Sequence, residues 1–217
     1  MSPIRQIVDR SRRVADLFRR GGEAGRATAY WAGLEDYHET NESDDTAWER
    51  SRWIAGTLVP ELGIGSVLEV GTNSGRNLAA LRAEHPDMPL RGIDVNERAI
   101  AFARERHQGI EFEVADANTW TEPANTWDAL LTMSVLDHIP DDATEALAAR
   151  MASIAAKYVV CVELFDGGHG TRGPFKYSRD TRELFERHGC RTVRWEKSPG
   201  QYAPTSQLWL YVGATPA

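Results

Sequence analysis

The chain of 217 residues is poor in cysteine and has no long apolar run. Its two cysteines, Cys161 and Cys190, stand far apart and outside any Cys-x-x-Cys or histidine-rich setting. This excludes a zinc site of the usual spacing and favours two reduced thiols in a cytosolic protein. No stretch of about eighteen apolar residues occurs, and the N-terminus has no continuous apolar region like that of a secretory signal. We therefore predict a cytoplasmic protein with no metal site and no membrane partner.

An excess of positive charge is also absent. The formal net charge is −7, which argues against a nucleic-acid partner because phosphate binding requires a basic surface. The hydrophobic content of 41% is ordinary for a globular chain and predicts a sizeable core. The length fits one domain better than two.

The first 60 residues differ in pattern from the rest. Residues 3–20 place apolar side chains and arginines at helical spacing, and Gly21 and Gly22 end that pattern. The arginines are either a solvated helix face or a contact with an acidic partner or a second copy of the chain, so a homodimer stays open. An acidic run follows over residues 35–49, and then a helix that we expect to end near Pro60. We interpret residues 1–60 as a helical cap on a main domain of residues 61–217.

From Ile64 onward, strands and helices alternate. Predicted strands cover residues 67–70, 90–95, 110–114, 129–133 and 158–164. Predicted helices cover residues 77–84, 97–106 and 142–155. This alternation indicates βαβ units and a parallel sheet with helices on both faces.

The C-terminal end breaks the alternation. Residues 191–196 and 207–212 form two predicted strands joined by a Pro- and Gly-containing loop at 198–204, with no room for a crossover helix. Such a pair is expected to be antiparallel. The predicted fold class is therefore α/β: a Rossmann-like sheet of parallel strands closed by an antiparallel C-terminal pair, with the N-terminal helical cap.

Three acidic residues mark three successive strand ends. Glu69 begins the turn Glu69-Val70-Gly71-Thr72-Asn73-Ser74-Gly75, where glycines let backbone approach a ligand and a helix N-terminus offers free N–H groups. Asp94 ends the second strand, where a carboxylate can bind ribose hydroxyls, and Asp116 follows the third, where it can accept from an adenine amino group. Singly, Asp94 could equally be a helix cap like Asn96, and Asp116 a turn residue. Together they indicate a nucleoside-binding site.

These segments resemble the class I methyltransferase family. VLEVGTNSG is similar to its first motif, RGIDVNERAIAFA to its second, EVADANTW to its third, and WDALLTMSVLDHIP to its fourth strand and loop. The resemblance covers residues 64–212 and implies S-adenosylmethionine as the cofactor. It implies that the methionine part of the cofactor faces Glu69, Gly71, Thr72, Asn73, Gly75, Met133 and Ser134, and that the nucleoside faces Asp94, Val95, Asp116 and Ala117.

One departure from the family pattern is Asn73, where glycine is common. Asparagine tolerates left-handed backbone better than most residues. Within the family, EVGTNSGRNLAAL, the Asp-His-Ile-Pro segment, the Glu163 strand end and the N-terminal YWAGLEDYHETN resemble methylases associated with pseudaminic acid biosynthesis.

Methyl transfer is an in-line displacement, so alignment of donor and acceptor supplies much of the catalysis. A general base helps when the acceptor is a protonated amine or a hydroxyl. His138 is the first candidate because imidazole titrates near neutral pH, and its alternative is a structural histidine bonded to the loop backbone. Glu163 is the second candidate; it could equally bind an acceptor amine or be a solvated residue.

The acceptor is a small molecule that we expect to enter between the cap and the loop after the fifth strand. The residues predicted to contact it are Tyr30, Trp31, Tyr37, His38, Arg172 and Lys176. The aromatic residues could instead serve packing, and the two cations could be plain surface charges. The glycine-dense segment 166–173 is either a mobile lid or a simple connection.

Two competing functions remain at this stage. A nicotinamide-dependent oxidoreductase would carry G-x-G-x-x-G, which the spacing of Gly71 and Gly75 does not provide. A non-catalytic protein that binds S-adenosylmethionine would also keep the acidic strand ends. The sequence does not identify the methyl acceptor, since one fold serves many acceptors.

Overall fold

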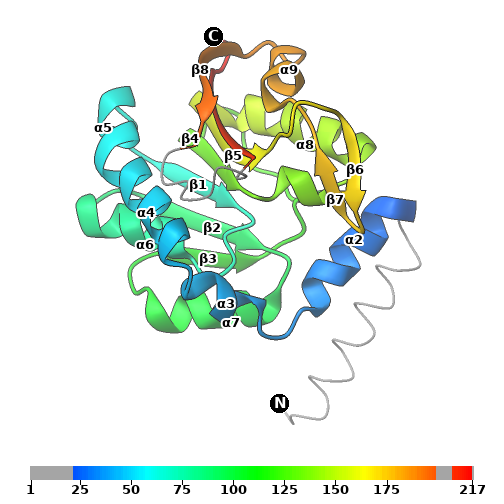
Figure 1. Cartoon of the computed structure of the whole chain (residues 1–217). Helices are drawn as coiled ribbons and strands as arrows, with labels where there is room; N and C mark the ends of the chain where they lie inside the picture. Colours follow the sequence, from blue (N-terminus) through cyan, green and yellow to red (C-terminus); the bar gives the residue numbers. More distant parts are fainter. Residues whose placement is uncertain (1–21, 199–206, 217) are drawn as a thin grey trace.

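The computed structural model describes residues 22–198 and 207–216 (Figure 1). The helix predicted over residues 3–20 and most of the loop predicted over 198–204 lie outside these ranges. The strands are β1 (Val67–Val70), β2 (Leu90–Asp94), β3 (Glu111–Val114), β4 (Trp127–Met133), β5 (Ala155–Leu164), β6 (Gly170–Gly173), β7 (Lys176–Ser178), β8 (Arg191–Lys197) and β9 (Leu208–Ala214). The helices are α2 (Gly22–Gly33), α3 (Tyr37–Glu42), α4 (Asp45–Trp53), η1 (Ile54–Leu58), α5 (Val59–Leu62), α6 (Arg76–Glu84), α7 (Glu97–Arg106), η2 (Leu136–His138), α8 (Asp141–Ile154) and α9 (Thr181–Glu186).

The described residues form one seven-stranded sheet in the order β3-β2-β1-β4-β5-β9-β8. The first five strands pair in parallel, and β9 pairs antiparallel with both β5 and β8. The fold class predicted from the sequence is confirmed, including the antiparallel closing pair. The strand order reverses between β1 and β4, which is where open α/β sheets bind ligands.

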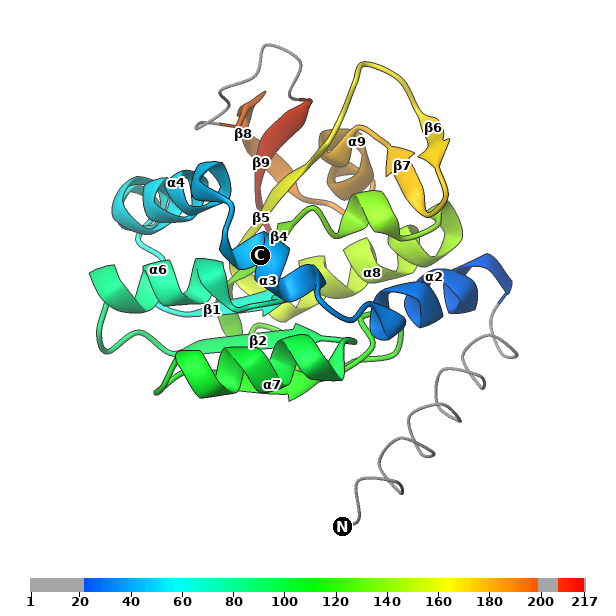
Figure 2. The ribbon, with the colours of Figure 1, turned by 60° about the horizontal axis from the view of Figure 1, so that its bottom comes forward.

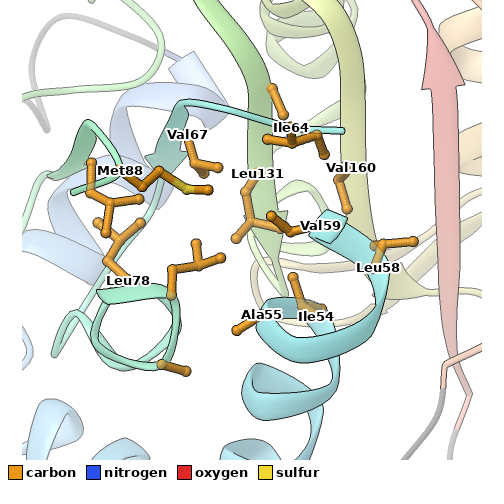
Figure 3. Packing of buried hydrophobic residues seen from close by; sticks show 14 of the residues in the cluster. Ile54, Ala55, Leu58, Val59, Ile64, Val67, Leu78, Met88, Leu131 and Val160 are labelled. Atoms are coloured by element: carbon orange, nitrogen blue, oxygen red, sulfur yellow. The ribbon is translucent and has the colours of Figure 1, made fainter. Parts of the chain in front are cut away.

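The two faces of the sheet are buried by different helices, and neighbouring residues of one strand serve opposite faces. Val67 packs with side chains of η1, α5, α6 and α7, whereas Leu68 packs with side chains of α8 and α9. Figure 3 shows the first cluster, in which Ile54, Leu58 and Val59 lie against Leu131 and Val160 of the sheet. This period of two is the expected pattern for a strand covered on both faces.

The N-terminal helices lie in two places. Residues of α2, α3 and α4 cover the carboxyl ends of the strands, and η1 and α5 pack on the sheet face that α6 and α7 also cover. α4, η1 and α5 form a continuous helical run with a π-helical turn at Ile54–Leu58, and the run ends at Gly63, whose φ is 61°. It therefore passes the end predicted near Pro60 by one short turn, because proline is compatible with the first turn of a helical segment. In Figure 2, α2 and α3 run between α7 and the β6–β7 hairpin. The division into a cap and a main domain stays an interpretation.

The sequence did not reveal two short elements after β5. Residues 170–178 form the β6–β7 hairpin, and α9 follows it. Asp166 accepts hydrogen bonds from Arg172 and from the Ser178 hydroxyl, so the glycine-dense segment is tied to the strand that follows it. The hairpin meets α2 (Figure 1). The Tyr177 hydroxyl donates there to Glu23 at 2.6 Å.

In the described ranges, every helix is too short or too polar to cross a membrane. The same ranges contain no group of histidine, cysteine, aspartate and glutamate side chains arranged to hold a metal ion.

Candidate functional site

A cavity of about 250 Å³ lies at the carboxyl ends of β1 to β4, under residues of α2, α3 and α4. Every residue predicted to bind the cofactor lines it except Gly75. The predicted residues on its wall are Glu69, Gly71, Thr72, Asn73, Asp94, Val95, Asp116, Ala117, Met133 and Ser134. Residues from all four strand ends therefore meet in one space.

The turn after β1 has the left-handed backbone that its sequence suggests. Gly71 has φ 73° and Asn73 has φ 48°, so asparagine occupies here a conformation that glycine would adopt freely. The N–H groups of Gly71 and Thr72 both donate to the carbonyl of Ile93 on β2. A Cβ on Gly71 would lie 2.4 Å from Cγ2 of Val135, so only glycine fits against the loop after β4.

Gly75 is the predicted cofactor residue that the structure does not place on the cavity wall. It does not line the cavity, and a Cβ on it would lie 2.7 Å from the Phe112 ring. It has φ 80°, it is the N-cap of α6, and its lack of a side chain leaves room for the Phe112 ring of β3. Its role in the structure is packing next to the site.

Glu69 lies at the floor of the cavity and is almost wholly buried. Its carboxylate accepts hydrogen bonds from the Thr72 hydroxyl, at 2.6 Å, and from the Asn77 amide. Burial raises the pKa of Glu69 to about 7, against the opposing effect of these two donors and of Arg76. Glu69 therefore braces the turn and the start of α6 from below.

Asp94 joins the first two strand ends. Its carboxylate accepts from the Asn73 N–H at 2.9 Å and from the Asn96 N–H at 2.8 Å. Burial raises its pKa, and these backbone donors oppose the rise. Asn96, not Asp94, caps α7 with its side chain, so the helix-cap alternative for Asp94 is wrong. One carboxylate thus holds two backbone segments while it borders the cavity.

Asp116 is both a turn residue and a residue of the cavity wall, which are the two roles that the sequence suggests. Its carboxylate accepts from the backbone and side-chain N–H groups of Asn118, which is a turn contact, and Asp116 also lines the cavity. Asn118 donates in turn to the Thr28 hydroxyl on α2, and Arg150 of α8 donates to the carbonyls of Ala117 and Asn118. The loop after β3 is therefore fixed from two sides.

Glu163 does not line the cavity, and the alternative of a solvated residue is also wrong. Its side chain is buried and accepts from the N–H groups of Val135, at 3.0 Å, and Asp137, at 3.3 Å. Burial and the neighbouring Asp137 carboxylate raise the pKa of Glu163 to about 8. Its visible task is to hold the loop after β4.

His138 lies on the cavity wall at the end of that loop. Its Nδ1 lies 2.9 Å from the carbonyl oxygen of Phe175, and because a carbonyl only accepts, Nδ1 is the donor. In the neutral ring, Nε2 then keeps its lone pair; it lies 3.6 Å from Asp137 Oδ1. The ring centroid is 4.2 Å from that of Trp31 on α2. The backbone bond of the structural alternative and a second nitrogen that makes no hydrogen bond are thus present together.

The predicted acceptor residues separate into two groups. Trp31 and Tyr37 line the cavity, whereas Tyr30, His38, Arg172 and Lys176 do not. His38 is buried with its ring 4.9 Å from that of Phe102, and Tyr30 packs on Phe175. Arg172 pairs with Asp166, and Lys176 is exposed on the hairpin. For these four residues, a packing or surface role describes the structure better than contact with the acceptor.

Sequence reasoning missed the wall that α3, α4 and the start of α6 supply. The main residues there are Asn41, Asp44, Arg50, Arg76 and Asn77. Arg76 follows the glycine turn directly, which was an available signal. The others come from a helix pattern that indicates only a cap, and their meeting with β1 depends on tertiary packing.

Several polar atoms on or beside the cavity wall lack a partner. Within the described residues, no hydrogen bond reaches Trp31 Nε1, Arg50 Nε, Asn73 Oδ1 or Asn118 Oδ1, although each atom is buried. Buried polar groups in native proteins are nearly always paired, so such a set indicates a place for a polar ligand. Carboxylates at two strand ends, an amide beside them and an arginine fit the hydroxyls, amines and carboxylate of a nucleoside linked to an amino acid.

The fold is that of class I methyltransferases. The chain superposes on magnesium protoporphyrin IX methyltransferase from Synechocystis, solved with its bound cofactor, with a TM-score of 0.64 over 93% of this chain and 91% of the other, at 14% identity.

Sequence comparison gives the same class. A family model described as a methyltransferase domain matches residues 67–157. A trans-aconitate 2-methyltransferase from Methylobacterium radiotolerans is 34% identical over 98 residues, which are 44% of this chain and 37% of that protein. A phosphoethanolamine N-methyltransferase from Triticum aestivum is 38% identical over 79 residues, 35% of this chain and 15% of the other. The matches therefore span less than half of either relative. They agree with the predicted methyltransferase domain over residues 67–157.

Proposed function

We propose that this protein transfers a methyl group from S-adenosylmethionine to a nitrogen or oxygen of a small molecule. The observation that carries the proposal is the set of buried, unpartnered polar atoms around the cavity beside Asp94. Bound there, the cofactor supplies an electrophilic methyl group on a sulfonium.

The wall residues divide by the chemistry they offer. Asp94 binds the ribose hydroxyls with the lone pairs that the two backbone donors leave free. Asp116, Ala117 and Asn118 face the adenine at the end of β3. The close turn at Gly71, together with Met133 and Ser134 on the facing strand end, receives the methionine part. Glu69 and Thr72 shape this region from below.

His138 acts as the general base in this proposal. The Phe175 carbonyl fixes the proton on Nδ1, which leaves Nε2 to take a proton from the acceptor. Trp31 packs on the ring and limits its movement. Such a fixed geometry is what a base requires before its pKa matters. Glu163 contributes by holding the loop, outside the reacting groups.

The acceptor enters beside Trp31 and Tyr37. Of the two relatives named above, one is named for a carboxylic acid and the other for an amine, so both oxygen and nitrogen acceptors fit the class. A sugar, amino sugar or natural-product intermediate stays within the proposal. Neither relative supports the resemblance to methylases of pseudaminic acid biosynthesis, which stays a prediction.

Two further predictions belong to the proposal. Residues 1–60 act as a cap over the cavity, which is supported by the contributions of α2, α3 and α4 to its wall. The protein is cytoplasmic. A homodimer stays open.

Titration calorimetry with S-adenosylmethionine and with NAD tests the cofactor. We expect binding of the first and none of the second; the reverse result would favour an oxidoreductase. A screen of small molecules by mass spectrometry, with S-adenosylhomocysteine as the monitored product, then identifies the acceptor. Cofactor binding with no product from any acceptor would favour a non-catalytic binding protein.

A further inference from the structure

We propose that the indole N–H of Trp31 and Nε2 of His138 together select a hydroxyl group as the methyl acceptor, so that the product is a methyl ether. The inference rests on the proposed function, which leaves nitrogen and oxygen acceptors open, and it names the class of acceptor. Trp31 is then a specificity residue of the same site.

Trp31, near the end of α2, places a hydrogen-bond donor without a partner at the cavity wall. Its side chain lines the cavity, and its buried Nε1 has no hydrogen-bond partner among residues 22–198 and 207–216. An indole N–H is a donor only, and a buried donor without a partner costs free energy. Such a group indicates a ligand atom that accepts a hydrogen bond.

The indole is held in place from two directions. Asn96 Nδ2 donates to the backbone carbonyls of Trp31, at 3.1 Å, and of Leu34, at 2.8 Å, which ties the end of α2 to the start of α7. The Trp31 ring contacts the rings of Tyr37 and His138, with centroid distances of 5.6 Å and 4.2 Å. These contacts fix the indole beside the imidazole.

His138 supplies the complementary group. Because its Nδ1 donates to the Phe175 carbonyl, Nε2 of the neutral ring is an acceptor, and within the described ranges it makes no hydrogen bond. A donor from α2 and an acceptor from the loop after β4 therefore belong to neighbouring rings of one cavity wall.

The two groups together match a hydroxyl. A hydroxyl oxygen has one proton and two lone pairs, so it donates to His138 Nε2, accepts from the Trp31 N–H and keeps one lone pair for the methyl group. As the new bond from oxygen to the methyl carbon forms, the carbon–sulfur bond breaks and its electron pair stays on sulfur. The proton of the hydroxyl passes to Nε2. The products are a methyl ether, a neutral thioether and a protonated imidazole.

Other acceptors satisfy only one of the two groups. A neutral amine has a single lone pair, which the methyl group requires, so the Trp31 N–H would stay unpaired. A carboxylate accepts from Trp31 but carries no proton for Nε2. A site built to hydrogen-bond one group discriminates strongly against an analogue that leaves a buried polar atom without a partner.

The wall near these two rings also contains uncharged residues from both elements. Those from α2 are Ala24 and Ala27, and those that follow His138 are Ile139 and Pro140. The carboxylate of Asp137, whose Oδ1 lies 3.6 Å from Nε2, belongs to a buried residue that does not line the cavity. Tyr37 does line it, but a phenol both donates and accepts and so does not distinguish between acceptors. These surroundings suit a neutral acceptor.

Nuclear magnetic resonance of isotope-labelled indole N–H groups tests the donor without turnover. The chain has seven tryptophans, and Trp31→Phe, which keeps an aromatic ring and removes the N–H, identifies the resonance of Trp31. Trp127 is the matched control: within the described residues its buried Nε1 also has no partner, but Trp127 does not line the cavity. Trp127→Phe identifies its resonance in the same way.

The wild type is saturated with S-adenosylhomocysteine, which has no methyl group to transfer, and is titrated with matched alcohols and amines. The pairs are benzyl alcohol with benzylamine and cyclohexanol with cyclohexylamine. We expect the alcohols to shift the Trp31 resonance downfield, as a gained hydrogen bond does, and the amines to leave it in place. The Trp127 resonance should stay unchanged throughout. No shift with either alcohol, or an equal shift with alcohol and amine, overturns the proposal.

Turnover with the acceptor from the screen gives a second test. Mass spectrometry of the product should locate the new methyl group on a hydroxyl oxygen, and a methyl group on nitrogen or on a carboxylate overturns the proposal. Trp31→Phe should lower kcat/KM by about tenfold, the effect of one lost hydrogen bond, while Trp127→Phe keeps the wild-type value. An unchanged kcat/KM in Trp31→Phe contradicts the role of the indole N–H.

Failure of the proposed function gives a different result. If the wild type binds neither S-adenosylmethionine nor S-adenosylhomocysteine, the proposed function fails, and the same titration without cofactor still tests the donor. A downfield shift of the Trp31 resonance with the alcohols alone supports the hydroxyl site, and no shift overturns it. If Trp31→Phe does not fold, a nuclear Overhauser effect to the neighbouring His138 ring identifies the Trp31 resonance in the wild type.

Discussion

Glu163 Oε2, at the end of β5, accepts a hydrogen bond from the backbone N–H of Val135 at 3.0 Å. The same oxygen also accepts from the N–H of Asp137, two residues further along the loop. Through these bonds a buried carboxylate fixes the loop that carries Ser134 and His138 on the cavity wall. The β4 end of the site is therefore organised by a side chain that does not itself line the cavity.

This arrangement predicts how Glu163→Gln alters the pH dependence of stability. Burial raises the folded-state pKa of Glu163 from its ordinary 4.5 to about 8, so its contribution to stability is full below the unfolded pKa and is lost as pH rises through about 8. A neutral glutamine removes this loss. Urea unfolding at about pH 5.5 and about pH 8.5 should show a smaller decline for Glu163→Gln than for the wild type.

Glu105→Gln, at an exposed position on α7, serves as the control. If Glu163→Gln and Glu105→Gln give the same pH dependence, Glu163 does not titrate in the way that its burial implies.

A second prediction compares two glycines with the same backbone. Gly71 has φ +73° and Gly109 has φ +76°, so alanine at either position incurs a left-handed strain of about 1–2 kcal/mol. Only Gly71 is crowded: its Cβ would meet Val135, whereas the Cβ of Gly109 has open space. Gly71→Ala should lower the melting temperature more than Gly109→Ala and should also weaken cofactor binding. The larger Gly71→Val should abolish binding.

Equal melting temperatures and unchanged calorimetry for the two alanine variants would mean that Val135 moves aside without consequence. The turn after β1 would then not depend on glycine at this position.

A third prediction concerns the ribose. Asp94→Ala removes the carboxylate that we assign to the ribose hydroxyls, and each charge-assisted hydrogen bond contributes about 1.5–3 kcal/mol. Affinity for S-adenosylmethionine should fall by at least about tenfold in calorimetry. Asp128→Ala is a suitable control because Asp128 pairs with Lys157 near the start of β4, at the opposite edge of the sheet. Wild-type affinity in Asp94→Ala would remove this residue from the cofactor site.

The sequence predicts the sheet well because each strand carries its own pattern. β1 and β4 are largely apolar runs followed by a turn, and the short loop between β8 and β9 permits only an antiparallel pair. The β6–β7 hairpin and α9 escape prediction because they are brief. The hairpin is glycine-rich, and α9 has six residues with Asp180 as its only clear signal, an N-cap.

The candidate site is predictable where it follows local motifs and not where side-chain direction decides. Asp94 ends β2 and Asp116 lies two residues after β3, so their place at the cavity follows from topology. Gly75 and Glu163 also sit at such positions, yet Gly75 faces Phe112 and Glu163 faces the backbone of the neighbouring loop. Arg50 reaches the cavity only because α4 packs on α6, a contact that no local pattern specifies.

The last prediction concerns His138 and separates catalysis from structure. His138→Ala removes both the Nδ1 donor to Phe175 and the free Nε2. His138→Asn is the sharper variant, because its side-chain amide can still donate toward Phe175 but offers no basic nitrogen. If Nε2 takes a proton from the acceptor, both variants should lower turnover by a factor of about 10² or more. Cofactor affinity should change little, because the base acts on the acceptor.

Turnover is measured as S-adenosylhomocysteine formed with the acceptor from the screen, and melting temperature reports on the loop. Loss of turnover in both variants, with the melting temperature of His138→Asn near that of the wild type, supports the base. A structural histidine predicts a different pattern: His138→Ala melts lower and loses turnover, while His138→Asn keeps both, because the bond to Phe175 would be the contribution that matters. Full activity in His138→Ala would contradict both roles, and methyl transfer would then depend on the alignment of donor and acceptor, which needs no proton acceptor at this position.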